Sequence, residues 1–203
     1  MNRRSLLVFA LIGVTAVLAG ALLARMLSQP QVPLVSGTWL PQPRPLPDFR
    51  LGDLDGRAFG RARLQGHPTL LFFGFTSCPD ICPTTLATLA EVQKSAPLPG
   101  SQVVFVTIDP ERDSAANLRV YLDAFSHEFI GLTGSAQAEQ PLLHSLGAVA
   151  VRQPLPDGGY TMDHSATLYV LDTRGRLAAV FTPPFNATRL TTDLRRIADS
   201  GRL

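Results

Sequence analysis

Two cysteines and one distant histidine are the residues of this chain whose types and spacing suit chemistry. Cys78 and Cys82 lie four residues apart in the run TSCPDICPTTL, and they are the only cysteines among 203 residues. A single pair is too little for a disulfide scaffold in a domain of this size, so the pair has a local purpose. A structural disulfide, a thiol–disulfide redox couple and a soft-metal site are all open at this point.

The cysteine pair lies between a short apolar run and a segment with helical periodicity. Residues Pro68–Phe75 (PTLLFFGF) predict a buried strand, and Pro83–Lys94 predicts a helix with Pro83 at its first position. Unpaired N–H groups and the dipole at a helix N-terminus favour an anion, so we expect the thiolate forms to be stabilised. Thiolates attack disulfides and also bind soft metals, so this placement alone does not choose between the two chemistries.

Spacing favours the metal site. The thioredoxin-type redox motif is C-x-x-C, whereas three residues separate Cys78 from Cys82, and an i to i+4 spacing brings side chains to one face of a helical turn. The third candidate ligand is His164, in the polar segment 160–165 before the predicted strand Ala166–Leu171, which we expect to be a loop facing the cysteines. Two thiolates and one imidazole suit Cu(I), and with added nitrogen or oxygen donors Cu(II). A structural zinc site would usually have four protein ligands.

A few other residues are candidates for supporting roles. Met162 could be a soft auxiliary ligand or a packing residue. Asp109 ends the predicted strand Gln102–Ile108 and could orient His164 or the cysteine loop, or cap the following turn. The remaining histidines are interpreted as ordinary surface residues: His67, His127 and His144.

Composition excludes two classes of function. The formal net charge of +2 comes from 18 basic and 16 acidic side chains scattered along the chain, without the basic block that would follow a phosphate backbone. Lys94 is the only lysine, and no glycine-rich phosphate loop precedes it. We therefore expect neither a nucleic-acid partner nor nucleotide hydrolysis.

The N-terminal residues predict a membrane anchor. Arg3 and Arg4 precede a charge-free stretch, Leu6–Ala24, which as a helix would span just under the roughly 30 Å of a bilayer core. By the positive-inside rule, the domain that follows would be extracytoplasmic. Small residues at 19–21 leave a cleaved signal peptide open as an alternative, and the NRRSLL start is only a weak match to a twin-arginine signal.

These patterns divide the chain into three parts. Residues 1–27 are the predicted anchor, and six prolines predict a semi-rigid spacer over residues 28–47. Residues 48–203 are the predicted globular domain, an α/β domain with a mixed sheet and the ground plan of thioredoxin-like folds. Its remaining predicted elements are helices at 114–125, 138–146 and 188–198 and two strands, 166–171 and 177–181, joined by the turn DTRG.

Four motifs in order along the domain resemble the SCO/SenC family, the copper chaperones that assist assembly of the binuclear copper site of cytochrome c oxidase. They are FFGFTSCPDICPTTL (72–86), VFVTIDPERD (104–113), FIGLTG (129–134) and MDHSATLYVLD (162–172). The resemblance implies a thioredoxin-fold domain tethered by an N-terminal helix, with copper ligands at Cys78, Cys82 and His164. Asp80 and Asp109 also match motif positions, outside this ligand set.

The predicted anchor indicates a cellular location, and the resemblance implies partners. We expect a single-pass protein of the bacterial inner membrane whose domain is monomeric and lies in the periplasm. The expected partner is the copper-site subunit of cytochrome c oxidase or another periplasmic copper chaperone. A metallochaperone needs no turnover, so the residues leave enzyme activity open. The alternative is a thiol–disulfide oxidoreductase that keeps the oxidase cysteines reduced, and a peroxidase is a weaker third interpretation.

Overall fold

The computed structural model describes residues 3–27, 33–95, 98–156, 158–201 and 203. The chain divides into two compact units, residues 1–31 and residues 32–203, and the first contains helix α1 (Arg3–Leu27). Among the residues whose side chains are described, no helix is both long enough and apolar enough to cross a membrane.

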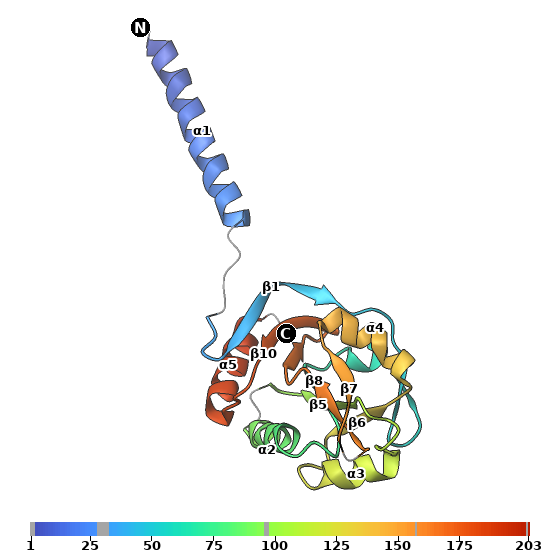
Figure 1. The fold of residues 1–203 in the computed structure, drawn as a ribbon. Helices are drawn as coiled ribbons and strands as arrows, with labels where there is room; N and C mark the ends of the chain where they lie inside the picture. Colours follow the sequence, from blue (N-terminus) through green and yellow to red (C-terminus); the bar gives the residue numbers. More distant parts are fainter. Residues whose placement is uncertain (1–2, 28–32, 96–97, 157, 202) are drawn as a thin grey trace. The chain divides into compact units, whose positions relative to one another are not determined.

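An eight-stranded mixed sheet organises the second unit (Figure 1). The strands follow the order β1-β10-β9-β4-β5-β6-β2-β3; β4, β5 and β6 are parallel, and β9 is antiparallel to both β4 and β10. This arrangement confirms the predicted mixed α/β domain. The strands are β1 (Gly37–Pro45), β2 (Leu51–Asp53), β3 (Ala58–Phe59), β4 (Thr69–Gly74), β5 (Gln102–Thr107), β6 (Ile130–Thr133), β9 (Leu168–Leu171) and β10 (Arg176–Phe181).

Helices connect and cover these strands. Helix α2 packs against α5, and α3 packs against β6 (Figure 1). The side chains of Ser114, Ser135 and Asn186 cap α3, α4 and α5 by accepting a backbone N–H of the first turn, which fixes where each helix begins. The helices are α2 (Ile81–Lys94), α3 (Ala115–Asp123), α4 (Ala136–Leu146) and α5 (Ala187–Asp199), with a short 3₁₀ helix, η1 (Arg61–Leu64).

The central strands form the core. All six residues of β4 are buried, and so are five of the six residues of β5. Parallel strands covered on both faces read as continuous apolar runs rather than as alternating ones, which is the pattern from which both strands were predicted. Since β4 leads directly into the cysteine loop, the buried centre of the sheet supports the site.

The proline-rich segment corrects the predicted domain boundary. Residues 37–45 are not a spacer but strand β1, which pairs with β10 at the edge of the sheet. Trp39 and Leu46 are buried in the core. An edge strand tolerates prolines because one side of it needs no ladder hydrogen bonds, and the pairing is irregular between Trp39 and Arg44, where two of the prolines lie. The compact unit begins at residue 32, and residues 28–32 lie outside the described residues.

A separate hairpin corrects the second prediction. Segment 160–165 was expected to be a loop, but Tyr160–His164 is strand β8, which pairs with β7 (Ala150–Pro154) in a two-stranded sheet apart from the main one. In β8, YTMDH, only Tyr160 and Met162 alternate with the polar Thr161 and Asp163, and so short an alternation was not recognised as a strand. The hairpin places His164 opposite Ala150 at the end of the strand.

Candidate metal centre

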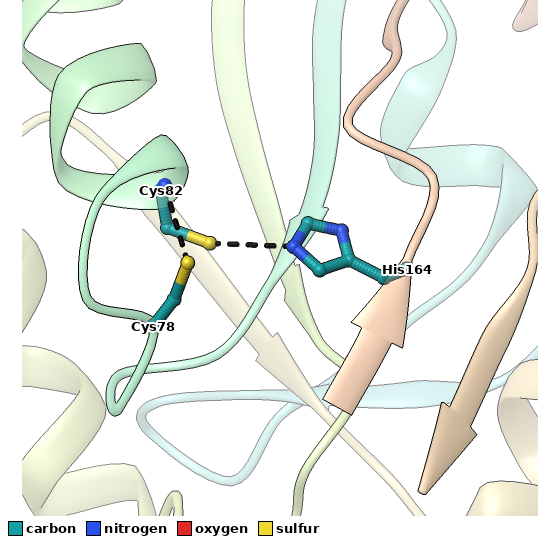
Figure 2. Close-up of side chains that lie close together, drawn as sticks. All are labelled: Cys78, Cys82 and His164. Atoms are coloured by element: carbon teal, nitrogen blue, oxygen red, sulfur yellow. Dashed lines mark hydrogen bonds between the residues drawn. The ribbon is translucent and has the colours of Figure 1, made fainter. Parts of the chain in front are cut away.

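The structure brings Cys78, Cys82 and His164 together from three separate elements. Cys78 lies in the loop after β4, Cys82 in the first turn of α2, and His164 is the last residue of β8 (Figure 2). Their sulfur and nitrogen atoms all lie within 4.8 Å of one another, and Cys82 Sγ lies 3.5 Å from His164 Nε2. Within the described ranges, this is the one group of three or more His, Cys, Asp or Glu residues arranged to hold a metal ion.

Helix α2 begins earlier than predicted. Its first residue is Ile81, so Pro83 is the third helical residue rather than the first, and Cys82 belongs to the helix. Pro83 is accepted there because the N–H that it lacks would have no partner within the helix. The free N–H of Cys82 instead donates to Cys78 Sγ at 3.4 Å. The helix N-terminus therefore acts on Cys78.

The protonation state of Cys82 differs from the one expected from the sequence. Its side chain is fully buried, and this burial, followed by the hydrogen bond with Cys78, raises the pKa of the Cys82 thiol well above its usual range. The expected stabilisation of the thiolate is therefore wrong for Cys82 in the metal-free protein. Removal from water penalises the charged form more than the helix N-terminus favours it. A cation beside the thiol would reverse that balance.

His164 presents a neutral nitrogen to the thiol. Burial is the main cause that lowers the pKa of its imidazole, only partly opposed by the hydrogen bond to Ser165 and by the Asp163 carboxylate. Nδ1 lies 3.1 Å from the carbonyl oxygen of Ser165, and because a carbonyl can only accept, Nδ1 carries the proton. The lone pair of Nε2 is thus directed at Cys82 Sγ.

Two aromatic rings fix the orientation of the imidazole. Phe72 and Phe75 meet the His164 ring edge to face, with centroids 6.0 and 5.9 Å away. Both belong to the segment that leads from β4 to the cysteines. The same segment therefore positions the thiols and supports the histidine.

The donor set suits a soft metal ion. Bond lengths of about 2.3 Å to a thiolate sulfur and about 2.0 Å to an imidazole nitrogen, taken from zinc sites, place the two donors about 3.7 Å apart around a three-coordinate ion. The observed separation of 3.5 Å between Cys82 Sγ and His164 Nε2 is close to that value. Two sulfurs and one nitrogen in an apolar surrounding fit Cu(I) by both ligand type and number.

Gly74 makes room for one of the sulfurs and was not singled out from the sequence. A Cβ atom at Gly74 would lie 2.9 Å from Cys82 Sγ and 2.8 Å from a ring carbon of Phe105. Only a residue without a side chain leaves Cys82 Sγ its place against the end of β4. A glycine that ends a buried strand just before a cysteine motif was the available signal.

Asp113 holds the cysteine loop and was also missed. Its carboxylate accepts hydrogen bonds from Thr76 N at 3.0 Å, from Thr76 Oγ1 at 2.5 Å and from Thr107 Oγ1 at 2.5 Å. Asp109, which was predicted as an orienting group, accepts instead from Tyr160 Oη at 2.9 Å, at the opposite end of β8 from His164. Both carboxylates come from the TIDPERD run, whose dense polar residues after a buried strand were the signal.

The other candidates have surroundings of their own. Met162 lies on the same face of β8 as His164 and packs against the core. Asp80 is exposed at the start of α2 and accepts from Thr84 Oγ1. The three histidines predicted as surface residues are exposed: His67, His127 and His144.

Comparisons with known proteins agree with this geometry. The SCO1/SenC family model matches residues 41–199. A Stutzerimonas stutzeri protein named as a candidate copper-binding protein is 36% identical over 203 residues, which cover 98% of this chain and 97% of that protein. The mitochondrial SCO2 homolog of Danio rerio is 35% identical over 73% of this chain, and the match covers 55% of its own length.

Solved structures show the same fold. The copper-bound structure of ScoI from Bradyrhizobium japonicum is 36% identical and superimposes with a TM-score of 0.67, covering 75% of this chain and 98% of that one. This likeness confirms the predicted thioredoxin-like domain. Because the family model spans most of the chain and includes all three site residues, the protein belongs to the SCO1/SenC family.

Proposed function

We propose that this protein binds one copper ion through Cys78, Cys82 and His164 and transfers it during assembly of the binuclear copper site of cytochrome c oxidase. The observation that carries the proposal is the convergence of two thiol sulfurs and a neutral imidazole nitrogen within 4.8 Å. Membership of the SCO1/SenC family, whose members act in cytochrome c oxidase assembly, supports the choice of metal and process.

Cys78, Cys82 and His164 have different roles when copper binds. A soft cation supplies the positive charge that allows the thiols to bind as thiolates, so Cys78 and Cys82 release their protons on binding. His164 needs no such change, because Nε2 is already unprotonated and its Nδ1–H remains bonded to Ser165. Cys82 is closed off from solvent, whereas Cys78, although buried, keeps 9% of its surface exposed and His164 is half-buried. A partner's ligands therefore approach from the side of Cys78 and His164.

A titration of the reduced, full-length protein in detergent tests the proposal. Competition with a coloured Cu(I) chelator should give one ion per chain. The variant His164→Ala should bind more weakly, and His67→Ala, which removes an exposed histidine from the other end of β4, should bind like the parent. Equal affinity of His164→Ala and the parent would exclude the three-ligand site.

Thiol–disulfide exchange is the second candidate. Cys78 supports it, because its sulfur is a free thiol that accepts the N–H of Cys82 at a helix N-terminus. A protein that reduces a disulfide substrate rapidly but takes up no copper in the same titration would favour this function. The strongly raised pKa of the Cys82 thiol disfavours it as the attacking group.

We also infer that α1 anchors the chain in the bacterial inner membrane, with residues 32–203 on the periplasmic side. The stretch Leu6–Ala24 carries no charge, residues 3–27 form one helix, and the large apolar side chains described between Phe9 and Leu23 are exposed. Arg3 and Arg4 would remain in the cytoplasm. Extraction of membranes with alkaline carbonate should leave the protein in the pellet; recovery in the supernatant would contradict the anchor.

A further inference from the structure

The hairpin that carries His164 needs to be fastened to the rest of the domain. Strands β7 and β8 form a two-stranded sheet that is not part of the main sheet, and no residue of either strand is fully buried. Two-stranded hairpins are marginally stable by themselves in water. The position of His164 therefore depends on contacts between the hairpin and the rest of the domain. Met162 packs against the core and two phenylalanine rings contact the imidazole, and further contacts lie at the two ends of the hairpin.

One end is held by backbone and hydroxyl contacts close to the histidine. Ser165 N donates to Val149 O at 3.0 Å, and Val149 N donates to Ser165 Oγ at 2.9 Å. These bonds join the two sides of the hairpin to each other. They do not join the hairpin to the domain.

The other end carries a cluster that does make this connection, which we call the latch: Asp109, Glu111, Arg112, Arg152 and Tyr160. The Tyr160 ring lies between two guanidinium groups, with Arg112 at 3.9 Å and Arg152 at 4.1 Å from its centroid. Tyr160 Oη donates to Asp109, and Arg112 Nη1 donates to Tyr160 O at 3.0 Å. Arg112 also pairs with Asp109, and Arg152 pairs with Glu111 at 2.6 Å.

The latch and the cysteine loop share one short segment. Residues 109–113 follow β5 and carry Asp109 and Arg112, which bind Tyr160, as well as Asp113, which binds Thr76 two residues before Cys78. Arg112 also lies 5.9 Å from the Phe75 ring, which in turn supports the imidazole of His164. One five-residue segment thus connects the part of the chain that carries the thiols to the part that carries the histidine.

We propose that Arg112 and Tyr160 are positioning residues: the latch holds the hairpin so that His164 Nε2 stays in reach of Cys82 Sγ. Neither residue contacts the three ligand atoms directly. Tyr160 and His164 lie on the same face of β8, four residues apart, so a shift of Tyr160 moves His164 with it. This inference rests on the proposed function for its copper measurement but not for its structural one.

A double-mutant cycle in the full-length reduced protein tests the proposal. Arg112→Gln removes the guanidinium that stacks on the Tyr160 ring from residues 109–113. It should lower the Cu(I) affinity about 10- to 100-fold, the range seen when groups that position a metal ligand are removed. In the His164→Ala background, the same substitution should leave the remaining two-cysteine affinity unchanged. An equal loss in both backgrounds would show general damage and overturn the positioning role.

Milder variants keep the test informative if Arg112→Gln folds poorly. Tyr160→Phe retains the stacked ring and loses only the hydrogen bond to Asp109, so its affinity should lie between those of the parent and Tyr160→Leu. Arg119→Gln is the matched control for charge, since it breaks an exposed pair with Asp55 and should bind like the parent. Equal affinity of Tyr160→Leu and the parent would overturn the proposal.

A metal-free measurement separates this inference from the proposed function. Amide hydrogen exchange in β7 and β8 should be faster in Arg112→Gln and Tyr160→Leu than in the parent, and unchanged in β4 and β5. Unchanged exchange in the hairpin would overturn the latch whether or not copper binds. Faster exchange in a protein that binds no copper would support the latch and refute the proposed function.

Discussion

Replacement of Gly74 by alanine is the sharpest test of how the sheet positions a sulfur. The new Cβ would lie 2.9 Å from Cys82 Sγ and 2.8 Å from the Phe105 ring, both closer than side-chain contacts allow. Cys82 and Phe105 are fully buried, so neither can move into solvent to relieve the contact. Either β4 or the cysteine must shift.

Gly74→Ala should destabilise the protein because the added methyl group overpacks the core. Insertion of one methyl group into a closely packed core costs about 1–3 kcal/mol, so the free energy of unfolding of metal-free Gly74→Ala should fall by about that amount. Urea denaturation of the reduced protein measures it. Cys82 Sγ is one of the two groups that the new Cβ would press against, the other being the Phe105 ring. The Cu(I) affinity should therefore fall as well, as measured in the competition titration.

Gly52→Ala supplies the matched control in the same sheet. Its Cβ would meet only Thr133 O at 3.6 Å, an ordinary contact, so we expect a change in stability within about 0.5 kcal/mol. Cys82→Ala removes the sulfur and should reduce the cost of Gly74→Ala by about 0.5–3 kcal/mol in a double-mutant cycle. A Gly74→Ala variant as stable as Gly52→Ala, or a cycle without coupling, would refute the reasoning.

Two further predictions concern buried carboxylates. Burial raises the pKa of Glu139 from 4.5 to about 8, so the folded protein binds an extra proton between these values and its stability should fall as pH rises from about 5 to 8. This loss of stability amounts to on the order of 3–5 kcal/mol between about pH 5 and pH 8.5, and Glu139→Gln should remove it. Urea unfolding of the parent protein with the same midpoint at about pH 5 and about pH 8.5 would contradict the prediction. Asp113→Asn should lower stability by about 1–3 kcal/mol, because an amide N–H would face the donors of Thr76, whereas exposed Asp55→Asn should change little in thermal unfolding.

The sequence by itself determined the elements that rest on local patterns. The apolar runs of β4 and β5, the capped helices and the turn between β9 and β10 were predictable, because each is specified by periodicity or turn residues within a few positions. In that turn, Asp172 accepts from Arg174 N and Arg176 N, and Gly175 adopts a positive φ of 68°. The same local reasoning placed Cys78 in the loop between a buried strand and a helix, but it began the helix too late to include Cys82.

Only the tertiary structure decided what depends on distant partners. Strand β1 forms because β10 offers it an edge, and strand β8 forms by pairing with β7; the prolines of β1 and the short, mostly polar run of β8 gave only weak strand signals by themselves. The protonation of Cys82 was likewise beyond the sequence, since it depends on burial by residues far along the chain, which outweighs the local helix N-terminus. The sequence could name His164 as a candidate, but a contact across 82 positions required the folded hairpin to bring Nε2 to Cys82 Sγ.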